Sequence, residues 1–192
     1  KELVKKRQNG QINDTLILAE HEPVYTLGKN ADKNHILQHL PKDVKTYHIE
    51  RGGDVTYHGP GQLVGYPILD LHNYKKSISW YMRALEQFII DTLAEFIVTA
   101  ERKDGLTGVW VGDEKIAALG VRVTRWITMH GFALNVKPDL TYYSSIIPCG
   151  IFEYGVTSMA RLLTDEVTVD SVKQVLIGKF MNQFRTVESM IG

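Results

Sequence analysis

The sequence predicts an α+β domain in which helices pack on a mixed, largely antiparallel sheet. Two features support this fold class. Short β-prone runs separated by hairpin-length turns occupy much of the chain, and residues 77–96 and 169–184 carry apolar residues at helical spacing. The 192 residues are enough for one well-packed core, so we expect a single domain over residues 1–192.

Composition argues against several classes of protein. Lys plus Arg and Asp plus Glu both number 22, so no net charge draws the chain to nucleic acid or to an anionic membrane. No apolar run approaches the ~18 residues of a membrane span, and the N-terminus has no signal-peptide apolar core. The single cysteine, Cys149, excludes a disulfide framework and a cysteine-based zinc cluster, and it fits a reducing compartment. We therefore expect no nucleic-acid partner, no membrane and no metal.

The first third of the chain predicts short strands and long connections. Residues 2–9 predict the end of a helix, and the polar stretch 29–43 predicts a loop with a short helix. Strands are predicted at residues 15–19, 24–27, 46–50 and 63–69. The first two strands flank His21-Glu22-Pro23, which predicts a strand–turn–strand unit.

The helix at residues 77–96 has the clearest pattern in the sequence. Apolar residues recur at i, i+3, i+4 and i+7: Ile78, Tyr81, Met82, Leu85, Phe88, Ile89, Leu93, Phe96 and Ile97. Ser77 or Ser79 can cap its first turn. The helix at residues 169–184 has a similar one-sided stripe, with Thr168 as its expected N-cap.

Between these helices the chain predicts three strands, at residues 107–111, 115–123 and 127–136. In the last strand, alternation places His130, Phe132, Leu134 and Val136 on one face and Gly131, Ala133 and Asn135 on the other. The small residues of the second face leave room for something to lie against the strand.

A glycine-rich stretch, residues 51–62, lies between two predicted strands. Glycine frees the backbone to approach a ligand, so the stretch predicts either a binding loop or a long polar hairpin loop. The spacing of Gly59, Gly61 and Gly65 misses the dinucleotide fingerprint by one residue, and a strand follows where that fingerprint requires a helix. The sequence also lacks a Walker A motif, an H-E-x-x-H motif and a nucleophile elbow, so nicotinamide and metal chemistry are unsupported.

Cys149 is the candidate nucleophile. It lies between Pro148 and Gly150, in a turn that can present a thiol to a pocket, although an inert loop thiol fits the same local sequence. A reactive thiol needs a base or cation beside it, because the thiolate is the nucleophile. Lys115 opens a run of small residues and is the candidate partner; a surface lysine at a hairpin end is the alternative.

Several motifs together resemble the octanoyltransferases of lipoate biosynthesis, the LipB family. The matching segments are residues 51–63, 115–122, 125–126, 130–136 and 148–150. They occur in the family's order, and the resemblance extends from about residue 25 to residue 158.

The resemblance implies an activity and a set of site residues. The protein would transfer an octanoyl or lipoyl group from acyl carrier protein to a lysine of a lipoyl-accepting domain, without a cofactor. Cys149 would carry the acyl group as a thioester, and Lys115 would lower the pKa of the thiol and act as acid and base. The implied acyl-binding residues are Arg51, Gly52, Gly53, Asp54, Val55, Thr56, Tyr57, His58, Ala118, Leu119, Gly120, Gly131, Phe132 and Ala133.

The resemblance also implies a fold, partners and a compartment. The fold would be that of the biotin and lipoate protein ligases, with residues 1–192 as one catalytic domain. The acceptors would be the lipoyl domains of 2-oxoacid dehydrogenase complexes and the glycine cleavage H protein. We expect a cytoplasmic enzyme, or a mitochondrial one if the source is a eukaryote.

Two other functions compete with this reading. An ATP-dependent lipoate or biotin ligase shares the fold and a related glycine-rich loop, but it forms an adenylate and needs no cysteine. A non-catalytic module that holds an acyl chain or a carrier domain would bind without turnover. The motif around Cys149 favours the transferase over both.

Overall fold

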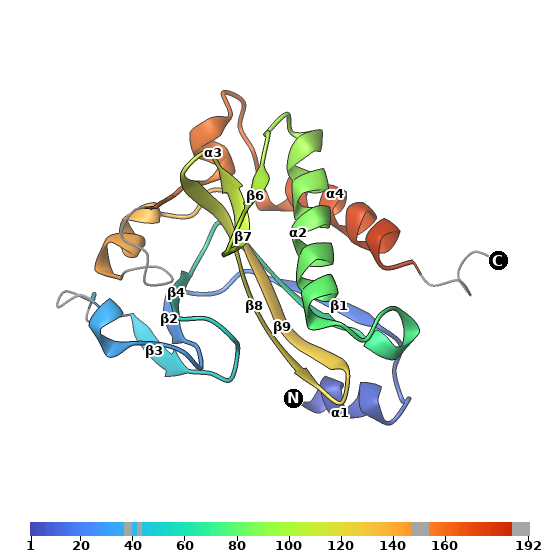
Figure 1. The fold of residues 1–192 in the computed structure, drawn as a ribbon. Helices are drawn as coiled ribbons and strands as arrows, with labels where there is room; N and C mark the ends of the chain where they lie inside the picture. Colours follow the sequence, from blue (N-terminus) through green and yellow to red (C-terminus); the bar gives the residue numbers. More distant parts are fainter. Residues whose placement is uncertain (37–39, 42–43, 147–153, 186–192) are drawn as a thin grey trace.

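The strands of the computed structural model, which describes residues 1–36, 40–41, 44–146 and 154–185, form two sheets (Figure 1). The larger has the order β1-β5-β9-β8-β7-β6, with β10 beside β8, and the smaller has the order β3-β2-β4. The strands are β1 Thr15–Ala19, β2 Val24–Leu27, β3 Lys45–His48, β4 Val55–His58, β5 Gln62–Ile68, β6 Glu101–Lys103, β7 Leu106–Val111, β8 Glu114–Thr124, β9 Ile127–Asn135 and β10 Gly155–Val156. The helices are α1 Glu2–Gln8, α2 Ile78–Glu95, α3 Met159–Leu162 and α4 Val169–Gln183, with 3-10 turns η1 Lys33–His35, η2 Leu71–Asn73 and η3 Leu140–Ser145.

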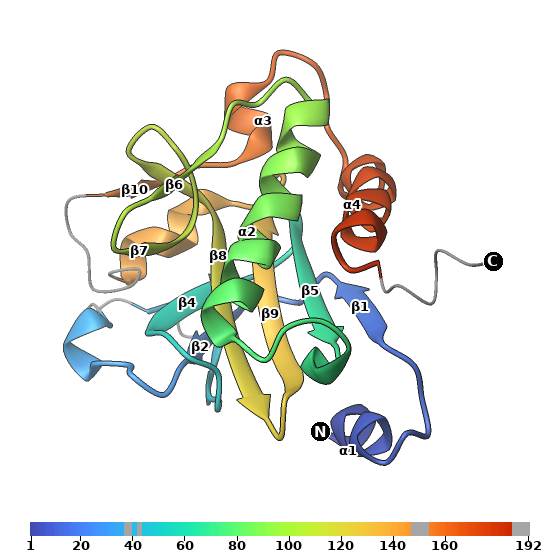
Figure 2. The same cartoon turned by 45° about the vertical axis from the view of Figure 1, so that its right-hand side comes forward.

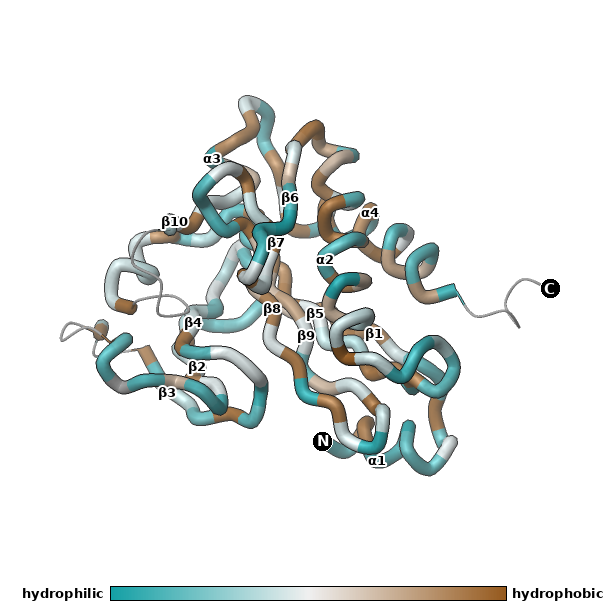
Figure 3. Tube along the Cα trace, in the orientation of Figure 1, coloured by the Kyte–Doolittle hydropathy of each residue, from teal (hydrophilic) through white to brown (hydrophobic). Residues whose placement is uncertain are grey.

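Helices α2 and α4 cover one face of the larger sheet (Figures 1 and 2). Each begins where the sequence predicts a cap, because Ser77 Oγ accepts a hydrogen bond from the Trp80 amide (3.2 Å) and Thr168 forms a capping box with Ser171. Hydrophobic residues recur along both helices between hydrophilic ones (Figure 3), and their apolar faces build the main core with the sheet.

The central strands β5, β9 and β8 are antiparallel, and their side chains alternate between the helix face and the opposite face. Phe132 of β9 points to the helices, where its ring lies 5.2 Å from that of Phe88. A Cβ on Gly65 would lie 2.1 Å from the same ring, so glycine on β5 makes room for Phe132. Strands β8 and β9 turn through Arg125 and Trp126, both at positive φ, as a two-residue hairpin of type I′ requires.

The smaller sheet lies on the side of the larger sheet away from α2 (Figure 1). The side chains of its strand β4 pack on both faces of the strand. Val55 and Tyr57 are buried in a second core with Tyr25 and Ile146, while Thr56 and His58 face the larger sheet. The Gly52 amide donates to the Val121 carbonyl (3.0 Å), which joins the loop before β4 to the larger sheet.

The α+β fold class is confirmed, and β1 and β2 have the predicted bounds. The two strands predicted on either side of His21-Glu22-Pro23 belong to different sheets: β1 pairs with β5, whereas β2 pairs with β3 and β4, so the connection crosses from one sheet to the other. The prediction of a loop over residues 51–62 was wrong for residues 55–58, which form β4, because Val55 and Tyr57 pack into the second core. In the described part of the chain, no helix has the length and apolar character to cross a membrane.

Candidate active site

A cavity of about 600 Å³ opens between the two sheets, within the size range of small-molecule sites. Strands β5, β8 and β9 of the larger sheet form one wall, and β2, β4 and the loop before β4 form the other. Its lining residues are His21, Glu22, Pro23, Val24, Thr26, Lys45, Tyr47, Ile49, Arg51, Gly53, Asp54, Val55, Thr56, His58, Val64, Tyr66, Ala118, Leu119, Gly120, His130, Gly131, Phe132 and Ala133.

Small side chains on β8 and β9 leave space in front of this wall of the cavity. Ala118 pairs with Ala133 and Gly120 pairs with Gly131, and all four line the cavity. At Gly120 the space is taken by the chain itself, because a Cβ there would lie 2.8 Å from the Gly52 carbonyl oxygen. The small-residue face therefore serves two purposes: it admits the glycine-rich loop at Gly120 and leaves open space beside Ala118 and Ala133.

Arg51 anchors the glycine-rich loop to the smaller sheet. Its guanidinium is buried and donates to the Thr26 carbonyl (2.7 Å) and the Thr26 hydroxyl (3.0 Å from Nη2). Gly53, at φ 86°, makes the turn that follows. Asp54 accepts from the Val55 amide (2.7 Å) and pairs with His35, which ties the loop to η1.

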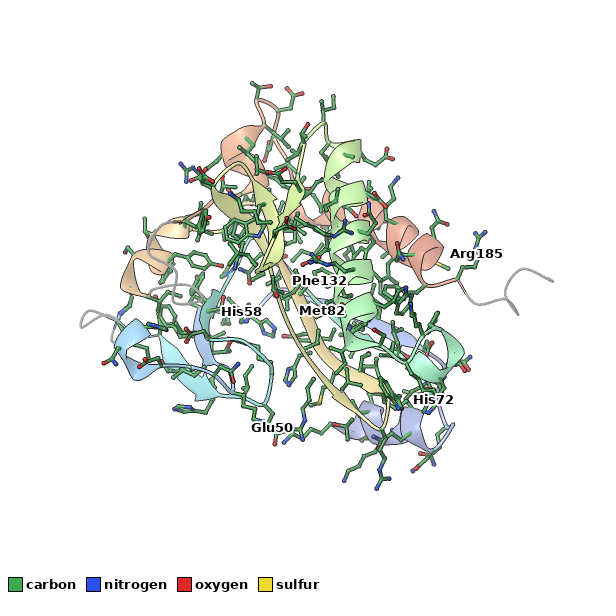
Figure 4. All side chains as sticks on the ribbon, in the orientation of Figure 1. Glu50, His58, His72, Met82, Phe132 and Arg185 are labelled. Carbon is green, nitrogen blue, oxygen red and sulfur yellow. The ribbon has the colours of Figure 1, made fainter. Side chains whose placement is uncertain are left out.

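Three histidines line the cavity, and burial favours the neutral form of each imidazole. Burial lowers the pKa of His58 to about 4, and it also lowers the pKa values of His21 and His130. His21 Nε2 lies 2.5 Å from the Tyr66 hydroxyl, on the neighbouring part of the wall. His58 lies on the side of β4 that faces the larger sheet (Figure 4). The cavity therefore offers polar atoms with little positive charge on its imidazoles.

Lys115 lies at the start of β8 and is buried, although it is not part of the cavity lining. Its Nζ lies 4.7 Å from the centroid of the Trp110 ring, close enough for a cation–π interaction. Gly108 makes room for the lysine stem, since a Cβ there would lie 3.1 Å from Lys115 Cε. The buried Glu86 of α2 accepts from the Gly108 amide (3.2 Å) and so supports this arrangement from the helix side.

Most of the expected acyl-binding residues line the cavity: Arg51, Gly53, Asp54, Val55, Thr56, His58, Ala118, Leu119, Gly120, Gly131, Phe132 and Ala133. Gly52 and Tyr57 do not. Alternation turns Tyr57 to the other face of β4, where its ring stacks on Tyr142 with centroids 4.6 Å apart. Phe132 turns its ring to α2, which leaves its backbone to the cavity (Figure 4). Cys149 lies outside the described residues.

Residues 1–181 match the family model of the lipoyl protein ligase A/B catalytic domain. The chain belongs to this family.

Two curated relatives of the chain are octanoyltransferases. One from Gloeobacter violaceus is 54% identical over 171 residues, which cover 89% of this chain and 76% of that protein. Another, from Cytophaga hutchinsonii, is 51% identical over 174 residues and covers 84% of this chain and 70% of that protein.

Solved structures confirm the fold at much lower identity. A bi-partite lipoate protein ligase from Thermoplasma acidophilum has a TM-score of 0.71 at 16% identity, covering 94% of this chain and 75% of that chain. Lipoate-protein ligase A bound with ATP has a TM-score of 0.72 at 15% identity, covering 88% and 72%. These likenesses confirm the ligase-like fold that the resemblance implied.

Several cavity residues were missed by sequence reasoning, among them His21, Tyr66 and His130. His21 and Tyr66 meet across 45 positions of sequence, which no local pattern predicts. His130 was placed on the face of Phe132, but its φ of 61° breaks the alternation, and its side chain joins the cavity next to Gly131. Within the described residues, no group of three or more His, Cys, Asp or Glu side chains could hold a metal ion.

Proposed function

We propose that this protein transfers an octanoyl group to a lysine side chain of a lipoyl-accepting protein domain. The assignment rests mainly on its similarity to octanoyltransferases, at 54% and 51% identity over most of the chain. A cavity of about 600 Å³, with alanine, glycine and valine among its lining residues on β5, β8 and β9, agrees with an alkyl substrate. Burying an eight-carbon chain there contributes ~0.8 kcal/mol for each methylene.

Cys149 is the proposed carrier of the acyl group. In the first step its thiolate attacks the donor thioester, a new thioester forms on Cys149, and the donor thiol leaves with a proton from Lys115. Donor and product are both thioesters, so this step needs no ATP. In the second step the acceptor lysine attacks the Cys149 thioester, the C–S bond breaks as the amide forms, Cys149 leaves as the thiolate, and Lys115, neutral after the first step, takes the proton of the amine.

The described surroundings of Lys115 support its role as acid and base. Burial and the Trp110 ring restrict the lysine stem, so Nζ is held in one place instead of moving in solvent. The ring of Tyr154, five positions after Cys149 in the sequence, lies 5.2 Å from the same Trp110 ring. One flank of the cysteine segment therefore approaches the lysine.

We propose acyl carrier protein as the donor. The proposed acceptors are the lipoyl domains of 2-oxoacid dehydrogenase complexes and the glycine cleavage H protein. Donor, acceptor and enzyme must share one compartment, which we propose is the cytoplasm of a bacterium or the mitochondrion of a eukaryote.

Intact-mass spectrometry tests both steps. Protein incubated with octanoyl carrier protein alone should gain one octanoyl group, and the Cys149→Ser variant should gain none. Adding a lipoyl domain without ATP should move the group to that domain. A modified domain without any enzyme adduct, or a Cys149→Ser variant with full activity, would contradict the thioester route.

An ATP-dependent ligase is the competing function, since lipoate-protein ligase A bound with ATP shares the fold. Identity to that protein is 15%, against 54% to the octanoyltransferase. A ligase would modify the domain only with free octanoate and ATP, and it would keep its activity as Cys149→Ala. A non-catalytic module would bind octanoyl carrier protein and release it unchanged.

A further inference from the structure

A chain of buried hydrogen bonds runs from the strand beside Lys115 to the cavity wall. The Thr157 amide donates to the Lys115 carbonyl (3.1 Å), and the Thr157 carbonyl accepts from Asn135 Nδ2 (3.0 Å). Asn135 Oδ1 accepts from Gln62 Nε2 (2.9 Å), and Gln62 Oε1 lies 2.7 Å from His58 Nδ1. Thr157, Asn135 and Gln62 are all buried, so water does not compete for these bonds.

Main-chain carbonyls at two points decide which way the side-chain amides face. The Thr157 carbonyl can only accept, so the Asn135 atom beside it is the NH₂ group and Oδ1 faces Gln62. The Tyr57 carbonyl also only accepts, and Gln62 Nε2 donates to it (3.3 Å) as well as to Asn135 Oδ1. Gln62 therefore presents its oxygen to His58.

An acceptor beside His58 Nδ1 fixes the tautomer of a neutral imidazole. Nδ1 must carry the proton to donate to Gln62 Oε1, so Nε2 keeps its lone pair. Nε2 lies 3.4 Å from the Thr26 hydroxyl, which already accepts from Arg51 and so has its own proton free to point to Nε2. The bonds on both sides of the ring agree on one arrangement.

We propose that Gln62 and Asn135 are positioning residues of octanoyl transfer, which hold His58 as the Nδ1–H tautomer and so fix the orientation of its ring in the cavity wall. The inference rests on the proposed function and deepens it. In the other tautomer the lone pair of Nδ1 would face the oxygen of Gln62, and the ring would lose the hydrogen bond that fixes its orientation in the cavity wall. A ring turned from this position would take up space that the alkyl chain occupies and oppose its binding.

The groups around His58 act on its pKa in opposite directions. Burial is the largest cause of its low pKa, and the electrostatic effects of Arg51 and His21 lower the pKa further, whereas the hydrogen bond to Gln62 raises it. Gln62 therefore sets the orientation and the tautomer, while burial and Arg51 keep the ring neutral. No carboxylate contributes to the pKa shift of His58 among the described residues.

Nitrogen-15 NMR of the histidine-labelled full chain tests the tautomer at pH 7. The His58 signal, assigned by its loss in His58→Gln, should show a protonated Nδ1 and an unprotonated Nε2 in the wild-type protein. A protonated Nε2, or an even mixture of tautomers, overturns the inference whether or not the enzyme transfers octanoyl. The expected tautomer in a protein that transfers no octanoyl would instead remove the proposed function.

Two variants test whether the chain acts on the substrate. Gln62→Leu removes the acceptor and should mix the two tautomers and raise the KM for octanoyl carrier protein about tenfold, with kcat changed less. Asn135→Ala leaves Gln62 its bond to the Tyr57 carbonyl and should give a smaller change of the same kind. Gln87→Leu, which removes a hydrogen-bonded glutamine from α2, is the matched control and should change neither quantity.

A merely structural role predicts a different result. Both site variants would then lower the melting temperature and the active fraction, with the wild-type KM and tautomer kept by the folded molecules. That result would overturn the positioning role. If Gln62→Leu does not fold, Asn135→Ala and the wild-type spectrum still decide between the two outcomes.

Discussion

Filling the cavity at Ala118 should shorten the acyl chain that the enzyme prefers. Ala118 lies on the cavity side of β8, whereas its neighbour Ala117 is buried in the core under the helices. An Ala118→Leu side chain would therefore extend into the cavity and leave the core unchanged. The strand pairing with Ala133 of β9 depends on the backbone and should persist.

The magnitude follows from the carbon atoms that compete for the space. Leucine adds three carbons at Ala118 and should displace about as many methylenes of the octanoyl chain. At ~0.8 kcal/mol for each methylene, the loss is about 2.4 kcal/mol, or about 50-fold in kcat/KM for the octanoyl donor. A butanoyl donor, which needs less of the cavity, should lose much less.

The assay is a competition between butanoyl, hexanoyl and octanoyl carrier protein for one lipoyl domain, resolved by product mass. Ala94→Leu adds the same carbons to an exposed position of α2 and serves as the control. The ratio of octanoyl to butanoyl product should fall about 50-fold in Ala118→Leu and stay constant in Ala94→Leu. An unchanged ratio in the active Ala118 variant would show that the acyl chain binds elsewhere.

Three further changes have expected outcomes. Lowering the pH from about 6.5 to 4 should destabilise the fold, because His58 binds a proton in the unfolded chain but stays neutral in the folded protein down to its pKa of about 4. The loss of unfolding free energy is at most about 3 kcal/mol, and it should be smaller in His58→Gln when both proteins are compared by denaturation curves. Trp110→Leu should lower kcat about tenfold at constant donor KM in steady-state assays, since Lys115 Nζ loses the ring 4.7 Å away, and Trp110→Phe should lose less. Thr168→Ala should cost about 1 kcal/mol in urea unfolding by removing the cap of α4, whereas a cost near zero would mean that the cap contributes little.

Patterns between near neighbours in the sequence were enough to predict several elements. The stripe of α2 and the caps at Ser77 and Thr168 depend on residues within a few positions of each other, and the structure has them as expected. The bounds of β1 and β2 follow from the same short-range logic. The small residues of β9 also pointed to a face that admits something, because side-chain size is readable without any partner.

The partners of these elements could not be read from the same patterns. Strand pairing depends on contacts across tens of residues, so the separation of β1 from β2 into two sheets had no local signal. The burial of Val55 and Tyr57 made a strand out of a glycine-rich stretch, because a second core was available. The left-handed backbone of His130 then reversed the face assigned by simple alternation.

The sequence by itself determined the α+β class, the main helices and the motifs that relate the chain to the octanoyltransferases, since these depend on residue type and short-range spacing. Only the tertiary structure decided where the cavity lies, which side of β4 faces it, and that His21, His58 and His130 share it. The tautomer assigned to His58 follows from bonds that join four separate segments of the chain. Desolvation and hydrogen-bond direction arise when distant segments meet, so both appear only in the folded protein.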